Sequence, residues 1–229
     1  MISVVIPTYN AEGTLGPTLA ALVPAVVHGT VLEAILVDGG STDDTCIIAD
    51  AVGTRLIRTK LGRGTQLQAG AAAARGDWLL FLHADTMLQP GWAEEAEAFI
   101  ERVTTGPRAQ AAAAFRFALD DDGIMPRLLE SLVALRCFLF ALPYGDQGLL
   151  ISRQLYRELG GFRPMPLMED VDLMRRLKRW QLVMLHSRAV TSGIRYRSEG
   201  YLARSLRNLC CMVLYFFRVP LRVLARLYG

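Results

Sequence analysis

The sequence predicts an α/β protein with a doubly wound, mostly parallel sheet flanked by helices and a C-terminal helical extension. First, short apolar runs alternate with helical patterns from residue 2 to about residue 90, which is typical of parallel strands joined by crossover helices. Second, each main apolar run ends in a cluster of polar residues. Third, the composition changes near residue 200: seven arginines and one glutamate lie between Arg195 and Gly229.

The first 90 residues contain four predicted strands, at residues 3–6, 31–37, 55–58 and 78–82. The last of them, WLLFL, is an unbroken apolar run of the kind found in strands buried on both faces. Pro7 is expected to end the first strand because proline cannot donate to a central ladder. Helices are expected at residues 14–27, 45–52 and 66–74.

The second half is predicted to continue with helices and two more strands. Helices are expected at residues 90–103, 127–142, 153–160 and 168–180, and strands at 110–119 and 149–152. A further helix is expected from residue 201, with Pro220 ending or kinking it and a short segment following at 221–227. We expect one domain over residues 1–200, followed by amphipathic helices over 201–229.

Composition limits the class of protein. The chain has 229 residues, of which 52% are hydrophobic, enough for one large core. The longest apolar run of the C-terminal part, residues 209–217, is far shorter than the ~20 residues that span a bilayer. The four cysteines show no metal-type spacing, and the chain starts directly with a strand, so we expect a reduced, cytoplasmic setting without a signal peptide. No nucleic-acid partner is expected.

Polar residues follow three predicted strands, where the carboxyl ends of a parallel sheet form a ligand crevice. They are Thr8-Tyr9-Asn10, Asp38 and Asp85. A carboxylate such as Asp85 can hold a hard divalent cation, which in turn can hold a diphosphate. The alternative is that Asp85 only caps the helix that begins near Pro90.

Five motifs, in order, resemble the inverting family 2 glycosyltransferases of the GT-A fold, over about residues 1–190. They are VVIPTYN (4–10), VDGGSTD (37–43), FLHAD (81–85), GGF (160–162) and EDVDL (169–173). The chain also resembles a small bacterial subgroup of such transferases. The resemblance implies a GT-A-type sheet, with residues 1–95 as the nucleotide-binding half and 96–200 as the acceptor half.

The resemblance also implies roles for individual residues. Asp85 corresponds to the second acid of the metal-binding Asp-x-Asp, and Asp170 to the catalytic base, with Glu169 beside it. Asp146 and Gln147, in a glycine-flanked loop, are expected to bind the acceptor, and Asp146 is also a competing candidate for the base. The expected nucleotide-binding residues are Pro7, Thr8, Tyr9, Asp38, Arg63, His83 and Ala84.

One departure from the family pattern concerns the metal. His83 replaces the first acid of Asp-x-Asp. A neutral imidazole can bind a transition metal or a ribose hydroxyl but adds no negative charge, which favours Mn²⁺ over Mg²⁺. The other interpretation is that His83 is merely a hydrogen-bonded residue at the end of a strand.

The resemblance implies a single-displacement sugar transfer from a UDP- or GDP-type donor to a hydroxyl acceptor. A metal on Asp85, with help from Arg63 and Arg195, would stabilise the leaving diphosphate. A carboxylate base would accept the hydroxyl proton, a contribution of about 10²–10⁴-fold. Arg176 stands where processive synthases carry the first residue of Gln-x-x-Arg-Trp, so non-processive transfer is expected.

Two other functions remain open on the sequence alone. One is a sugar-phosphate nucleotidyltransferase-like enzyme, against which stands the absence of a long glycine-rich loop after the first strand. The other is a catalytically silent, membrane-associated module that binds nucleotide sugars. The acceptor is unidentified, and a lipid-linked one is among the options. The basic C-terminal helices are expected to contact the inner face of the plasma membrane. The alternatives are that they pack on the body of the protein or contact a second copy of the chain.

Overall fold

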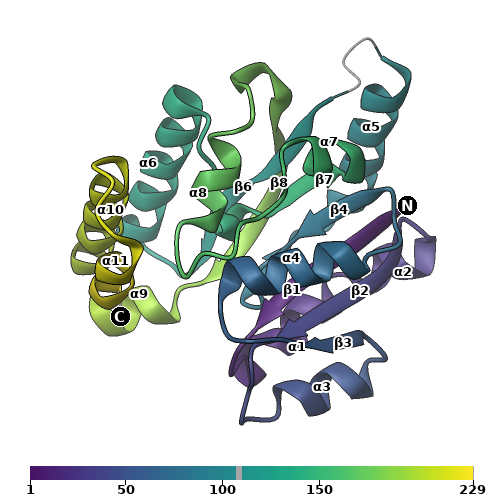
Figure 1. The fold of residues 1–229 in the computed structure, drawn as a ribbon, viewed down its shortest axis with the longest axis horizontal. Coiled ribbons are helices and arrows are strands. Elements are labelled where there is room, and N and C mark those ends of the chain that lie inside the picture. The colour runs from purple at the N-terminus through teal and green to yellow at the C-terminus, as the bar shows by residue number, and fades with distance from the viewer. Residues whose placement is uncertain (107–109, 229) are drawn as a thin grey trace.

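The structure, a computed structural model, describes residues 1–106 and 110–228. Its described strands form one sheet in the order β3-β2-β1-β4-β7-β6-β8-β5 (Figure 1). The pairs within β3-β2-β1-β4 and the pair β6-β8 are parallel, and the remaining pairs are antiparallel. This confirms the predicted α/β fold with a mostly parallel sheet. The strands are β1 (Ile2–Thr8), β2 (Val31–Asp38), β3 (Arg55–Arg58), β4 (Trp78–Phe81), β5 (Thr86–Leu88), β6 (Ala112–Asp120), β7 (Leu149–Ser152) and β8 (Leu182–Ser192).

Helices cover both faces of the sheet. One core cluster joins a sheet face to α1, α2, α3 and α5, and a second joins the other face to α4, α7 and α8. Val4 and Ile6 of β1 belong to the first cluster and Val5 to the second, as the alternation of a strand requires. The helices are α1 (Glu12–Ala20), α2 (Val23–His28), α3 (Thr45–Ala51), α4 (Arg63–Ala73), α5 (Trp92–Thr105), α6 (Ile124–Phe140), α7 (Arg153–Glu158), α8 (Glu169–Met174), α9 (Ile194–Glu199), α10 (Tyr201–Phe216) and α11 (Leu221–Tyr228), with 3₁₀ turns at Gly145–Gln147 and Arg179–Gln181.

Two proline positions differ from the sequence prediction. The helix expected at residues 14–27 is two helices, because Pro24 lies in the first turn of α2 and cannot continue α1. The strand expected to stop before Pro7 continues to Thr8. Val5 accepts from the Leu82 amide on the β4 side and Thr8 accepts from the Gly39 amide on the β2 side. Pro7 faces the β4 side beyond the last β1–β4 pair, so its missing N–H removes no ladder bond.

Three elements were not predicted: β5, β8 and α9. The run of β8 is interrupted by His186, Ser187 and Arg188, so it lacks the apolar pattern of a buried strand. The helix expected to continue to residue 180 ends at Met174, and the short 3₁₀ turn at Arg179–Gln181 follows.

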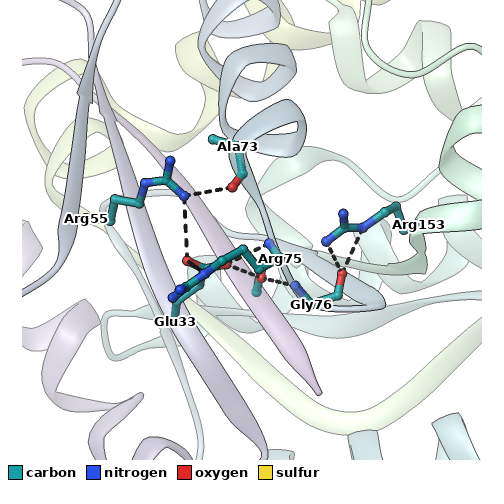
Figure 2. Close-up of polar contacts among 7 residues, drawn as sticks. Glu33, Arg55, Ala73, Arg75, Gly76 and Arg153 are labelled. Carbon is teal, nitrogen blue, oxygen red and sulfur yellow. Dashed lines mark hydrogen bonds and ion pairs between the residues drawn. The ribbon is translucent and has the colours of Figure 1, made fainter.

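A buried carboxylate fastens the amino-terminal ends of the strands, opposite the crevice (Figure 2). Glu33 of β2 accepts from the Ser3 hydroxyl at 2.8 Å and from the Arg75 amide at 2.7 Å. The Ser3 hydroxyl in turn accepts from the Gly76 amide, and Gly76 O accepts from the guanidinium of Arg153. β1, β2, β4 and α7 are therefore joined at one point before the chain reaches the site.

The C-terminal helices pack on the body of the molecule. Cys211 of α10 and Leu224 of α11 are fully buried in a cluster with Leu167, Met168 and Val171. Figure 1 shows α9, α10 and α11 together beside the end of α6. In the described residues no helix combines the length and apolar character needed to cross a bilayer.

Candidate active site

A cavity of about 520 Å³ opens at the carboxyl ends of β1 and β4. Residues from both halves and from the C-terminal helices line it, as the topology of an open α/β sheet predicts. Of the predicted site residues, the lining includes Pro7, Thr8, Tyr9, Arg63, His83, Ala84, Asp85, Asp146 and Asp170. Asp38, Gln147 and Glu169 are not part of this lining.

The β1 end forms one wall of the cavity. Thr8 is 1% exposed, and its hydroxyl has no hydrogen-bond partner among the described residues. Tyr9 is 51% exposed and free to stack on a flat ligand. Gln66 of α4, which the sequence analysis did not single out, donates to Thr8 O at 2.8 Å and to Val37 O at 2.7 Å. It fixes β1 and β2 where this wall of the cavity begins.

Asp38 points into its own loop instead of the cavity. Its carboxylate accepts from the Gly40 amide at 2.9 Å and from the amide and hydroxyl of Ser41 at 3.0 and 2.5 Å. Burial opposes its ionisation, but these hydrogen bonds lower the pKa of Asp38. Ser41 also accepts from the Asn10 amide, so Asp38 shapes the loop that carries Asn10 to the cavity.

Half-buried Arg63 and fully buried Glu169 form an ion pair beside the cavity, with Arg63 Nε 3.6 Å from Glu169 Oε1. Glu169 is 1% exposed, and its Oε2 has no partner among the described residues. Burial raises the pKa of Glu169 to about 7, against the effect of Arg63. Burial alone would lower the pKa of Arg63, but Glu169, Tyr228, Asp170 and Asp85 raise it. Arg63 is thus a fixed positive charge in the cavity wall.

His83 packs against the loop that follows α6. A Cβ on Gly145 would lie 2.5 Å from His83 Nε2, so only glycine fits there. Burial, together with the charge of Arg63, lowers the pKa of His83 to about 4. The imidazole is therefore neutral at pH 7, as a metal ligand must be.

Asp85 keeps its carboxylate largely free. In the described part of the chain its carboxylate accepts one hydrogen bond, from the Thr86 hydroxyl at 3.5 Å. Among the described residues no group of three or more His, Cys, Asp or Glu side chains has the arrangement of a complete metal site. The donor set still fits Mg²⁺ or Mn²⁺ held jointly with a substrate, because such ions often use one or two carboxylates plus substrate phosphates.

Two more carboxylates face the cavity from different elements. Asp170 Oδ2 accepts from the Gly145 amide at 2.8 Å, and its Oδ1 accepts from the Val171 amide at 2.7 Å. Asp146 Oδ1 is buried with no partner among the described residues. Burial raises the pKa of Asp146 to about 6, and the charges of Asp170 and Asp85 act in the same direction. The neighbouring carboxylates thus add to the burial that opposes ionisation of Asp146.

Gln147 lies behind the cavity wall. It is 1% exposed and donates to Phe115 O at 3.0 Å. Its amide oxygen accepts from the Tyr144 amide, the Arg136 guanidinium and the Cys137 thiol, each at 3.3 Å. With these bonds made, its side chain holds the loop that presents Asp146.

The C-terminal helices supply lining residues that the sequence analysis did not assign: Tyr196, Arg204, Asn208 and Tyr228. Arg195, expected to fold back towards the site, also lines the cavity. Arg204 is 6% exposed, is paired with Glu199 at 2.6 Å, and lies 5.4 Å from the ring centre of Tyr228. The sequence did contain a signal for this inner face: Arg204 and Asn208 lie one helical turn apart in a helix rich in apolar residues.

A protein-family model described as "Glycosyl transferase family 2" matches residues 3–145. Among curated proteins, glucosyl-3-phosphoglycerate synthase of Mycolicibacterium paratuberculosis is 39% identical over 93 residues, covering 37% of this chain and 28% of the relative. A PGL/p-HBAD biosynthesis glycosyltransferase of Mycobacterium bovis is 39% identical over 95 residues, covering 38% of this chain and 36% of the relative. The chain thus matches about a third of the length of these relatives.

Solved structures extend the similarity to most of the fold. Glucosyl-3-phosphoglycerate synthase from Mycobacterium tuberculosis, in complex with Mn²⁺, UDP and glucosyl-3-phosphoglycerate, superposes with a TM-score of 0.59 at 26% identity. The match covers 83% of this chain and 70% of that one. A complex of that synthase with Mg²⁺ and UDP gives the same TM-score and coverage.

Proposed function

The chain belongs to glycosyl transferase family 2, and from this premise we propose that it moves a sugar from a nucleoside-diphosphate sugar to a hydroxyl acceptor. We propose a single, metal-assisted displacement with inversion at the anomeric carbon, without processive elongation. The observation that carries the proposal is the meeting of Arg63, Asp85, Asp146 and Asp170 around one cavity at the carboxyl ends of β1 and β4.

The donor is proposed to lie along the β1 end. Pro7, Thr8 and Tyr9 offer an apolar and aromatic wall with one unpaired buried hydroxyl, which suits a nucleobase and its ribose. UDP is favoured over GDP because the synthase from M. tuberculosis was solved with UDP and with UDP-glucose. Asp38 is proposed to act indirectly, through the loop that it organises.

The leaving diphosphate carries most of the charge that develops during transfer. Mn²⁺ or Mg²⁺ on Asp85, when bound, would act as a Lewis acid towards it. Arg63, held by Glu169, and Arg195 add fixed positive charge from the protein itself. Neutral His83 is proposed to contact the ribose or the metal without competing for that charge.

Asp170 is proposed as the base that removes the acceptor proton. Backbone amides of Gly145 and Val171 fix its carboxylate, which is the preorganisation that a base needs. Glu169 positions Arg63 beside it. Asp146, with a free buried oxygen, is proposed to accept a hydrogen bond from the acceptor, and it remains the competing candidate for the base. Gln147 is proposed to position Asp146.

Two other functions are less well supported. A nucleotidyltransferase-like enzyme would need a phosphate-binding loop after β1, where this chain has Pro7-Thr8-Tyr9-Asn10. A silent binding module would have no need for two carboxylates poised opposite the donor wall.

The acceptor and the cellular location belong to the proposal as well. The solved synthase was crystallised with phosphoglyceric acid. A small phosphorylated acceptor is therefore proposed as an alternative to a lipid-linked one. We propose a cytoplasmic enzyme whose C-terminal helices contact either a membrane surface or a second copy of the chain.

The experiment that tests the function is nucleotide release. Purified protein with Mn²⁺ and UDP-, GDP-, dTDP- or CDP-sugars should release nucleotide faster with an acceptor extract than without it. Binding can be screened first by thermal shift, since a ligand at 100 times its Kd stabilises a protein by about 2.7 kcal/mol. Proton NMR of the product then gives the anomeric configuration. Release of pyrophosphate would favour the nucleotidyltransferase, and binding without any release would favour the silent module.

A further inference from the structure

An exposed apolar surface on two helices takes no part in the core or the cavity. On α6 its residues are each at least 47% exposed: Leu128, Leu132, Leu135, Phe138 and Leu139. On α10 they are each at least 41% exposed: Leu202, Leu206, Leu209, Val213 and Phe216. We call these residues the α6–α10 surface. Contiguous apolar patches beyond a few hundred Å² are rare on monomers and usually mark a binding site.

Helical geometry separates this surface from the packing of α10. Leu202, Leu206 and Leu209 recur every three or four residues and share one face. Arg204, Asn208 and Cys211 share the opposite face, which lines the cavity or packs on the body. Leu206 and Leu209 are 64% and 51% exposed, so they contribute little to attachment of the helix.

The two helices belong to one region of the molecule. Tyr201, the first residue of α10, packs in a cluster with Val133 and Cys137 on the buried face of α6. Figure 1 shows α6 and α10 next to one another. Near the end of α6, Arg179 donates to Leu139 O at 3.1 Å, and the following Trp180 is 53% exposed. An exposed tryptophan next to arginines is typical of the membrane–water interface.

Charge distinguishes between the possible occupants of the surface. Between the end of α10 and the end of α11 lie three exposed arginines and no acidic residue: Arg218, Arg222 and Arg226. Arg204 and Arg207, by contrast, are paired with Glu199. Arg175 adds a cation 5.2 Å from the ring centre of Phe216. A two-fold dimer through this surface would bring like charges together, which is unfavourable. Anionic lipid headgroups complement them.

We infer that the α6–α10 surface binds the surface of an anionic lipid bilayer, with its leucines and phenylalanines at headgroup depth and the arginines at the phosphates. Because the other face of α10 lines the cavity, binding would place the acceptor end of the cavity beside the membrane. The position of the acceptor in this arrangement rests on the proposed function. Binding to the bilayer does not, and it is measurable without turnover.

The test is cosedimentation of the full chain with vesicles of phosphatidylglycerol and phosphatidylcholine, compared with phosphatidylcholine alone. The protein should bind the anionic vesicles and bind more weakly as salt rises. The pairs Leu206→Gln/Leu209→Gln and Leu132→Gln/Leu135→Gln should each weaken binding by at least about tenfold. Arg222→Gln/Arg226→Gln should weaken binding to the anionic vesicles only.

The matched control is Val23→Gln/Val27→Gln on α2, where the valines are 49% and 83% exposed on another helix. It should bind like the unmodified chain, and thermal melting should show that all variants fold. No binding to anionic vesicles, equal binding to neutral ones, or unchanged binding of both leucine pairs would overturn the inference. So would a salt-insensitive dimer in sedimentation velocity that the α10 pair dissociates.

Discussion

At the scale of single residues, Asp85 is the group on which metal-dependent binding should depend. Its carboxylate is almost free of protein partners, so its removal costs the fold little. We predict that Asp85→Asn abolishes Mn²⁺-dependent binding of UDP and leaves the melting temperature nearly unchanged. Isothermal titration calorimetry with and without Mn²⁺ measures this, and unchanged metal-dependent affinity in a folded variant would rule out the assignment.

Asp170 should affect turnover more than donor binding. Since a general base contributes about 10²–10⁴-fold, Asp170→Asn should lower kcat by that factor at a nearly unchanged Kd for the donor. Asp146→Asn, in the same assay, serves as the comparison. If Asp146→Asn alone produced this loss while Asp170→Asn turned over normally, the two roles would have to be exchanged.

Asp146 should give the reaction a pH dependence on the acid side. Its pKa is raised to about 6 by burial, so the carboxylate is ionised above that pH and protonated below it. An ionised Asp146 can accept the hydroxyl of the acceptor, and we predict that KM for the acceptor rises as pH falls through about 6. Asp146→Asn should flatten this dependence. A profile with the same acid limb in the variant would assign the titration to another group.

Sequence reasoning located most of the cavity lining because strand ends are readable in an α/β pattern. Asp85 and His83 follow β4, and Pro7 to Tyr9 close β1. It could not tell which polar side chains turn inwards. Asp38 is engaged by Ser41, and Gln147 by Phe115 O, a backbone atom of a strand 32 residues away. Such partners are set by tertiary packing and leave no local pattern.

At the scale of elements, Glu33 holds four segments together at the far end of the sheet (Figure 2). Burial opposes its ionisation, but hydrogen bonds from the Arg75 amide and Ser3, and the charge of Arg75, lower the pKa of Glu33. A lowered pKa in the folded state means that the stabilisation is present above the unfolded value and is lost as pH falls through the folded one. Glu33→Gln should therefore cost about 1–3 kcal/mol near pH 7.

Urea unfolding followed by circular dichroism at several pH values checks this prediction. The difference between the two proteins should shrink as pH falls below the ordinary glutamate pKa and then through the lowered pKa of folded Glu33, because the unmodified carboxyl also becomes protonated. Glu101→Gln, at an exposed carboxylate of α5 with no side-chain partner among the described residues, provides a control expected to change stability by less than about 1 kcal/mol. An equal, pH-independent loss in both variants would mean that the charge of Glu33 is unimportant.

Strands were predictable where a short apolar run stood between glycine or polar residues. β3 and β7 were predicted with their observed bounds, and β4 and β2 to within one residue. β8 was not predicted because it is only partly buried and carries polar residues in its middle. β5 was not predicted because three residues are too few to show a period. The antiparallel pairs of β7 follow from long-range topology, which local patterns do not encode.

At the scale of the whole molecule, the C-terminal helices pack on the body and help to line the cavity. Their inner face covers Leu167, Met168 and Val171, which flank Asp170, and contributes Arg204, Asn208 and Tyr228 to the cavity. The sequence analysis considered two external partners for these helices and packing on the body as alternatives. In the structure one face of α10 packs on the body and the other exposes apolar residues. Packing on the body is therefore compatible with an external partner on the exposed face.

Removal of residues 201–229 should therefore do more than abolish any membrane contact. It exposes the apolar side chains beside Asp170 and opens one wall of the cavity, while the β1 wall, Arg63 and Asp85 stay in place. We predict that the chain ending at Gly200 melts about 5–10 °C lower, as a loss of about 2–3 kcal/mol implies for this size. It should still bind UDP with Mn²⁺ and lose turnover.

The surface pair Leu206→Gln/Leu209→Gln is the control, and it should keep its turnover on a soluble acceptor. Differential scanning calorimetry measures the melting temperature, and the nucleotide-release assay measures turnover. A truncated chain with an unchanged melting temperature and normal turnover would show that α10 and α11 are needed neither for stability nor for turnover. The prediction would then be wrong.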